Sequence, residues 1–138
     1  MQPITRNELE TRAEAYDAAV ARDPAVDCFC TSSTWLLPYH DAFAPQRPLW
    51  AACDGDAWLL LAENTHPRGS HLEPLENMWG FASPLVGAGA AALLATALAE
   101  RPLARPRIVG NCLLLLGRAD LGLGAQRAAL VQRRDQVA

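Results

Sequence analysis

The sequence contains no lysine, because all twelve of its basic residues are arginine. This absence excludes catalysis through a side-chain amine, whether as a Schiff base or as a lysine bound to phosphate. The arginines are dispersed along the chain, and the net charge is -3. A basic tract or stripe, which is typical of nucleic-acid-binding proteins, is therefore missing, and we expect no nucleic-acid partner.

Long hydrophobic runs are also missing. The longest candidates, residues 93–98 and 113–116, are far shorter than the roughly 20 residues that span a bilayer. The charged first 20 residues contain no apolar core of a secretory signal. The use of arginine, alanine, leucine and proline is typical of a GC-rich genome. We therefore expect a cytoplasmic bacterial protein without a membrane partner.

The four cysteines are unfavourably spaced for metal or redox chemistry. Cys28 and Cys30 are separated by one residue instead of the two of a Cys-x-x-Cys motif, and no second pair exists. Cys53 and Cys112 each stand alone in an apolar run. In a reducing compartment all four would be free thiols, and we expect them to be buried and structural.

The polar stretch at residues 64–74 is the other place where ligands for a metal could gather. His66 and His71 lie in it, and Glu63, Glu73 and Glu76 lie nearby. Together they could form a metal site or a general-base cluster. The spacing matches no compact ligand motif, however, and the stretch resembles a solvated loop. We predict no metal site.

The remaining sequence predicts one mixed α/β domain over residues 1–138, long enough to bury a core without disulfides. The expected order of elements is α-α-β-β-β-α-β-α. The expected helices are residues 5–22, 31–43, 88–100 and 121–134, and the expected strands are residues 49–53, 57–62, 75–82 and 107–116.

Two local signals support this order. Asp54-Gly55-Asp56 between two apolar runs predicts a β-hairpin over residues 49–62, which we expect to pair with the strand at 75–82. Pro38 lies inside the second helix and is expected to kink or shorten it. No stretch before the first helix is typical of a strand.

A glycine-bearing turn, Gly87-x-Gly89, precedes the alanine-rich helix at residues 88–100. A turn of this kind aims free backbone N–H groups at an anion such as a phosphate, here from Val86, Gly87, Ala88, Gly89 and Ala90. Alternatively, the two glycines close a tight turn that needs positive φ angles. Pro84 removes one donor, and the turn contains no arginine.

The order of elements is similar to the GNAT acyltransferase fold, in which a strand–turn–helix holds the pyrophosphate of acyl-coenzyme A. The signature of that family, Gln/Arg-x-x-Gly-x-Gly/Ala, corresponds to residues 84–89, with Pro84 at its first position. Residues 33–36 and 41–43, Ser-Thr-Trp-Leu and Asp-Ala-Phe, also resemble the opening of FemAB-like proteins, which contain two GNAT-like halves. The resemblance extends over residues 31–116.

The resemblance implies an acyl-coenzyme A site at residues 84–89 and attack of an amine on the thioester. Glu63 or Glu76 would be the base, and Trp79 would line the pocket. The opening strand of the family and its last strands are missing from the predicted elements. We therefore predict a degenerate, non-catalytic GNAT-like domain that works with a partner chain. The alternative is a small acyl-coenzyme A-dependent N-acyltransferase.

The apolar run at residues 107–116 leads to an expectation about assembly. Its continuous apolarity is typical of a strand that is covered on both faces. An exposed edge of this kind would invite pairing, and the last helix can cover a face but cannot pair an edge. We expect a homodimer or a fixed protein partner, with residues 113–116 and the final helix at the interface.

Overall fold

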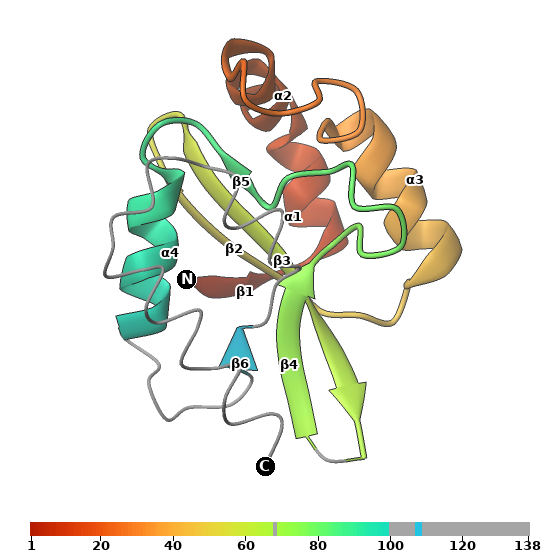
Figure 1. Cartoon of the computed structure of the whole chain (residues 1–138). Helices are drawn as coiled ribbons and strands as arrows, with labels where there is room; N and C mark the ends of the chain where they lie inside the picture. The colour runs from red at the N-terminus through yellow and green to blue at the C-terminus, as the bar shows by residue number, and fades with distance from the viewer. Residues whose placement is uncertain (68, 100–106, 109–138) are drawn as a thin grey trace.

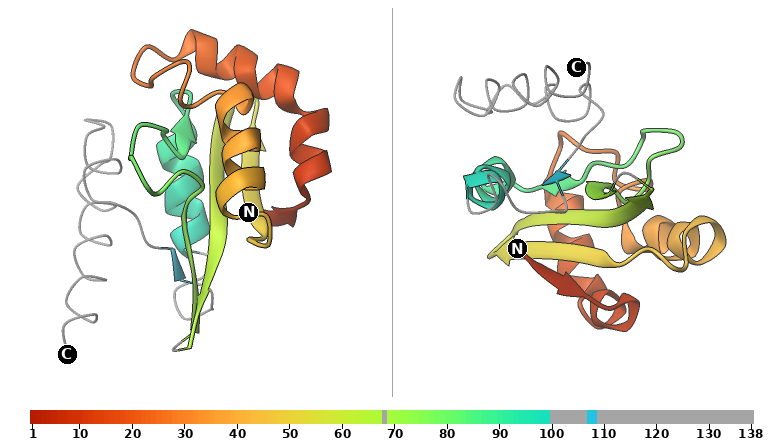
Figure 2. Two further views of the ribbon diagram at one scale, coloured as in Figure 1. Left: turned by 90° about the vertical axis from the view of Figure 1, so that its right-hand side faces the viewer. Right: turned by 90° about the horizontal axis from the view of Figure 1, so that it is seen from below.

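The computed structural model describes residues 1–67, 69–99 and 107–108. Within them a sheet lies between three helices on one face and one on the other, which makes a mixed α/β fold (Figures 1 and 2). The elements in chain order are β1 (Gln2–Ile4), α1 (Arg6–Thr11), α2 (Ala13–Arg22), α3 (Ser33–Phe43), β2 (Leu49–Asp54), β3 (Ala57–His66), β4 (Gly69–Pro74), β5 (Leu85–Val86), α4 (Ala90–Ala99) and β6 (Arg107–Ile108).

Strand β3 is the centre of the sheet. Among the described residues the strands follow the order β1-β2-β3-β4-β6, and β5 pairs with β3 beside β4. The first five strands pair antiparallel, and β6 pairs parallel with β4. One edge of β3 is shared, because Leu59 lies opposite Leu85 of β5 and Leu61 lies opposite Pro74 of β4. The chain between Pro74 and Leu85 therefore leaves the sheet and returns to it.

The structure confirms the hairpin at residues 49–62 and corrects the strands around it. Gly55 has φ 55° in the turn between β2 and β3. The polar stretch at residues 64–74 is a second hairpin, formed by the end of β3 and by β4, and not a loop. The segment predicted as a strand at residues 75–82 is a loop, so the hairpin pairs instead with β4 and β5.

The helices agree with the sequence better than the strands do. The predicted helix at residues 5–22 is two helices, because Arg12 departs from helical geometry with φ −98° and ψ 3°. Thr5 begins α1 with a capping box, in which its hydroxyl accepts the Glu8 N–H and the Glu8 carboxylate accepts the Thr5 N–H. Helix α3 runs to Phe43 through Pro38. The structure also adds a strand that we did not expect, β1, which pairs with β2.

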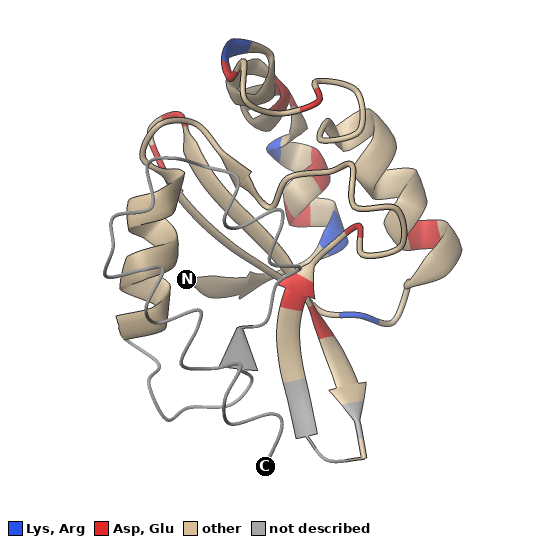
Figure 3. Ribbon diagram, in the orientation of Figure 1, with Lys and Arg blue, Asp and Glu red and all other residues tan. Residues whose placement is uncertain are grey.

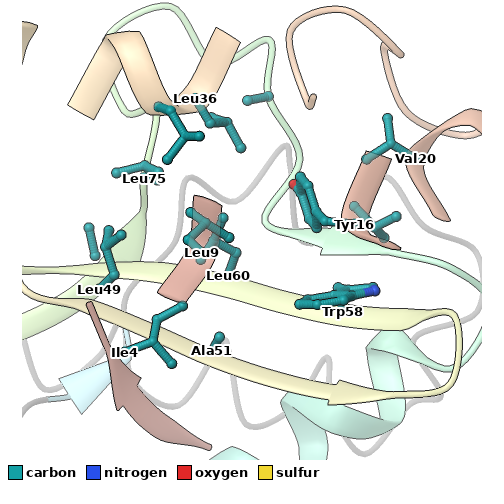
Figure 4. Packing of buried hydrophobic residues seen from close by; sticks show 14 of the residues in the cluster. Ile4, Leu9, Tyr16, Val20, Leu36, Leu49, Ala51, Trp58, Leu60 and Leu75 are labelled. Atoms are coloured by element: carbon teal, nitrogen blue, oxygen red, sulfur yellow. The ribbon is translucent and has the colours of Figure 1, made fainter. Parts of the chain in front are cut away.

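Two hydrophobic cores fill the two faces of the sheet. Alternate residues of β3 point to opposite faces, so Trp58 and Leu60 lie under α1–α3 and Leu59 and Leu61 lie under α4. Figure 4 shows the first of these cores, where Tyr16 of α2 packs edge-on against Trp58 with ring centroids 5.5 Å apart. A strand buried on both faces explains the unbroken apolar sequence of residues 57–62.

Among the described residues no helix has the length and apolarity that crossing a bilayer requires. Of the predicted strand at residues 107–116, Arg107 and Ile108 form β6. Residues 109–116 and the predicted final helix at residues 121–134 lie outside the described residues.

Two buried tyrosines allow a matched test of the core. The Tyr16 hydroxyl is buried without a hydrogen-bond partner among the described residues, and burial raises its pKa. The Tyr39 hydroxyl donates to Asn77 Oδ1 at 3.0 Å. Because an unpaired buried hydroxyl opposes folding, we expect Tyr16→Phe to leave the free energy of unfolding unchanged or to raise it, and Tyr39→Phe to lower it by about 1 kcal/mol. Urea denaturation of both variants measures the difference.

Candidate functional site

The glycine turn that begins α4 is held in a conformation that only glycine adopts easily. Gly87 has φ 83°, and a Cβ atom placed there would lie 2.4 Å from the carbonyl oxygen of Asp56. Gly89 has no positive φ angle, and its Cβ would lie 3.1 Å from that of Ala57. The turn therefore packs its backbone directly against the β2–β3 turn.

A carboxylate of the protein itself accepts a hydrogen bond from a backbone N–H group of this turn. Asp23, the residue that ends α2, accepts the Gly87 N–H through Oδ2 at 2.7 Å and the Ala25 N–H through Oδ1 at 3.0 Å. The Ala90 N–H is also engaged, since it donates to the Gly87 carbonyl at 3.1 Å. Val86 is part of β5, opposite Trp58. Of the five residues predicted to bind an anion, Ala88 and Gly89 alone are exposed.

Glu76 is buried, with 1% of its surface exposed, and its carboxylate holds the loop at residues 75–84 together. Its Oε1 accepts the Trp79 N–H at 2.6 Å, and its Oε2 accepts the N–H groups of Phe81 at 2.9 Å and Ala82 at 3.3 Å. Burial favours the neutral acid, but these backbone hydrogen bonds outweigh it, so the pKa of Glu76 is lowered.

Glu63, the other carboxylate predicted as a base, lies in a different part of the molecule. It lies opposite Leu72 in the β3–β4 pair, and its Oε2 accepts the indole N–H of Trp50 at 3.1 Å. Trp50 and Leu72 both belong to the core under α4. The structure therefore places Glu63 on the α4 side of the sheet and does not bring it together with Glu76.

Trp79 lies at the surface against a stripe of aromatic residues along α3. Trp35, Tyr39 and Phe43 are spaced four residues apart and share one side of that helix. The Trp79 ring centroid lies 5.9 Å, 5.8 Å and 5.7 Å from theirs. Phe29 contacts Trp35 at 5.5 Å. We call these five residues the aromatic patch; in Figure 1 the loop that bears Trp79 runs beside α3.

A polar network borders the aromatic patch at the end of β4. Glu73 is its centre: Oε1 accepts from Arg47 Nη2 at 2.7 Å, from Asn64 Nδ2 at 3.0 Å and from Asn77 Nδ2 at 2.7 Å. The other carboxylate oxygen lies 3.3 Å from His71 Nε2. Sequence reasoning named Glu73 and His71 but missed Arg47 and Asn77, because nothing in their local sequence shows that they approach β4.

The cysteines differ from expectation. Cys28 and Cys53 are exposed and Cys30 is partly buried, so the prediction of buried thiols is wrong for the first two. Cys53 lies near the end of β2, where the last two residues of the strand are exposed. Cys112 lies outside the described residues. Within the part of the chain that the structure describes, no three His, Cys, Asp or Glu residues gather in a metal-binding group.

Comparison of the chain with models of protein families gives no match, and comparisons with curated proteins and with solved structures give none either.

The role of Glu76 can be tested by removing its charge. Glu76→Gln replaces one acceptor oxygen by an amide group that cannot accept, and leaves a backbone N–H group of the loop without its bond. We expect the free energy of unfolding to fall by about 2 kcal/mol. As a matched control, Glu14→Gln changes the same charge on the exposed first turn of α2 and is expected to have a much smaller effect. Equal effects of the two substitutions would contradict a structural role for Glu76.

Glu76 also predicts an acid sensitivity. Because its pKa in the folded protein is below the ordinary value of 4.5, the unfolded chain binds more protons as the pH falls. The stability that ionised Glu76 contributes is complete above pH 4.5 and is lost as the pH falls through the lowered pKa. Glu76→Gln should therefore flatten the decline in melting temperature below that pH, whereas Glu14→Gln should leave the decline in place.

Substitutions at two glycines can separate the cost of backbone strain from the cost of a steric collision. Gly80 has φ 72° with no atom within 4 Å of an added Cβ, whereas Gly87 has both a positive φ and the collision with Asp56. We expect Gly80→Ala to lower the free energy of unfolding by about 1 kcal/mol and Gly87→Ala to lower it by distinctly more. Thermal denaturation compares them, and equal losses would show that the close approach at Gly87 costs nothing.

Proposed function

We propose that this protein is a GNAT-like domain that does not carry out acyl transfer and works together with a partner chain. The fold is mixed α/β, and the described residues include an opening strand, β1, ahead of the first helices. An opening strand is a feature of the GNAT order that the predicted elements lacked, and in this respect β1 supports the proposed likeness in fold. The chemistry of the glycine turn decides which function we favour.

The observation that carries this proposal is the hydrogen bond from the Gly87 N–H to Asp23 at 2.7 Å. In a coenzyme site the N–H groups of such a turn would face phosphate oxygens. Here a carboxylate of the chain already accepts one of them, and its negative charge would repel a pyrophosphate. Residues 69–99 contain no arginine or lysine, and Arg22, which precedes Asp23 in the chain, is paired with Asp56 at 2.7 Å.

The two predicted bases support the same conclusion. Glu76 is engaged by the backbone of its own loop, and its lowered pKa disfavours proton uptake near neutral pH. Glu63 lies on the other face of the sheet, bonded to Trp50. A base that accepts the proton of an attacking amine must be within hydrogen-bond reach of it. Neither carboxylate is both available to accept a proton and placed beside the glycine turn.

One observation favours the alternative, a small acyl-coenzyme A-dependent N-acyltransferase. Strands β4 and β5 take successive parts of one edge of β3, and the chain between them leaves the sheet next to the glycine turn. The loop between β4 and β5 would then have to supply backbone groups for the pantetheine arm of a coenzyme, because the Leu60 N–H of β3 already donates to the Pro84 carbonyl at 2.9 Å. In this alternative Ala88 and Gly89, both exposed, would supply the remaining N–H donors.

Acetyl-coenzyme A distinguishes the two functions. A ligand at a hundred times its Kd stabilises the native state by about 2.7 kcal/mol, so binding would raise the melting temperature by several degrees. We expect no saturable rise in differential scanning fluorimetry with acetyl-coenzyme A. Pyrophosphate at the same ionic strength controls for general anion effects. A saturable rise with the coenzyme alone would support the acyltransferase instead.

The variant Asp23→Asn sharpens this comparison. It keeps a side-chain oxygen near the Gly87 N–H and removes the negative charge that opposes phosphate. If the wild type gives no shift with acetyl-coenzyme A but Asp23→Asn does, Asp23 is what excludes the coenzyme. Binding by both proteins would show that the carboxylate does not block the turn.

The existence of a partner chain can be tested by measuring the mass of the protein in solution. We expect static light scattering at micromolar concentration to show a homodimer, or a partner of fixed stoichiometry to copurify from the native source. The interface predicted at residues 113–116 lies outside the described residues. A monomer that copurifies with no protein would contradict this part of the proposal.

A further inference from the structure

We propose that the aromatic patch, through its exposed residues Phe29, Phe43 and Trp79, is a docking surface for an apolar, arginine- or lysine-bearing segment of a partner protein. The inference deepens the proposed function, since it rests on the existence of a partner and names the surface and the chemistry through which the partner binds.

The exposed hydrophobic area is concentrated in this part of the molecule. Among the described residues the large hydrophobic side chains that remain exposed are Phe29 (57%), Phe43 (55%), Met78 (57%), Trp79 (46%) and Phe81 (63%). Three of them belong to the aromatic patch, and the other two flank Trp79 in the same loop. Single exposed hydrophobic residues are ordinary, but a contiguous group of aromatic side chains marks an interaction surface.

Hydrogen bonds within the protein hold the backbone on both sides of the patch. The Glu76 carboxylate fixes the backbone at Trp79, and the Tyr39 hydroxyl bonds to Asn77. On the other side, Asp27 accepts the Phe29 N–H at 3.0 Å, and the Ser32 hydroxyl donates to the Phe29 carbonyl at 2.7 Å. Fixed aromatic side chains lose little conformational entropy on binding, which is a property of residues that dominate interfaces.

Charge indicates what kind of partner the patch accepts. The carboxylates nearest in sequence to its residues are Asp27, Asp41, Glu73 and Glu76, of which Asp41 and Glu73 are paired with Arg6 and Arg47. Figure 3 shows acidic positions on α3, on the loop before it and on the loop that bears Trp79, and a basic position on the loop that follows α3. The pKa of Asp27 is lowered by the N–H of Cys30, and that of Glu76 by the N–H groups of its loop, so both carry negative charge at neutral pH.

Among the described residues, the arginines paired with these carboxylates do not reverse the charge, because two arginines stand against four carboxylates. Arg6 pairs with Asp41 and Glu10, and Arg47 pairs with Glu73 at 2.7 Å. The faces of tryptophan, tyrosine and phenylalanine rings also attract cations, arginine in particular. An acidic surround and several ring faces therefore favour a segment that offers aliphatic side chains together with arginine or lysine, and disfavour an acidic one.

The test uses the whole protein and three synthetic helical peptides. The first has leucine on one face and arginine on the other, the second replaces arginine by glutamate, and the third replaces leucine by serine. Isothermal titration calorimetry measures each Kd. We expect micromolar binding of the first peptide, at least about tenfold weaker binding of each of the others, and a Kd that rises with salt.

Two patch variants and one control locate the binding site. Phe29→Ser and Phe43→Ser alter side chains that are more than half exposed, so the fold should tolerate them. Leu98→Ser makes the same kind of change at a partly buried leucine of α4, on the other face of the sheet. We expect each patch variant to weaken binding of the first peptide by about tenfold and the control to leave it within a factor of two.

The opposite results overturn the inference. These are no binding of the first peptide below millimolar concentration, equal binding of the glutamate peptide, or equal losses in the patch variants and the control. If the patch variants convert a dimer to a monomer in light scattering, the occupant is a second copy of this chain and not a cationic partner. A failure of the proposed function would be detected in a different experiment, as saturable binding of acetyl-coenzyme A.

Discussion

The burial of β3 on both faces and its pairing along both edges are the constraint on which the rest of the structure depends. Its alternate side chains enter two cores, one under α1–α3 and one under α4. One edge is filled by β2, and the other is divided between β5 and β4. Because two strands divide that edge, the chain between them must leave the sheet, and the surface loop that results carries Trp79 and Glu76.

The loop shows how a buried charge can organise a surface. Taking a carboxylate out of water is unfavourable unless its oxygens are hydrogen-bonded. Glu76 meets that requirement with backbone N–H groups of its own loop, so its charge is used to fix a conformation. The same conformation leaves Trp79 against the side of α3 and Phe81 exposed. Glu76, which the sequence suggested as a catalytic base, therefore fixes the loop that exposes these aromatic side chains.

At the glycine turn, too, a carboxylate of the protein accepts a backbone N–H group. The N-terminus of a helix favours negative charge whatever its source. Asp23 supplies it from the end of α2, which joins that helix to the turn ahead of α4 across the sheet. Gly87 is needed because the turn touches the backbone of Asp56, and this structural requirement exists whether or not a ligand binds. A glycine motif of this kind is therefore compatible with a purely structural role.

The sequence by itself determined the elements whose signals are local: helical structure within residues 5–22 and 31–43, the hairpin at Gly55, and the turn that begins α4. For the candidate site it indicated Gly87, Trp79 and Glu76 as special positions, without their partners. Tertiary structure alone decided that three residues at 2–4 form β1, that the polar residues 69–74 form β4, and that Asp23 and Arg47 reach Gly87 and Glu73. The physical reason is that helix caps and tight turns are stabilised by neighbours in the chain, whereas short strands and buried carboxylates depend on groups that are distant in the sequence.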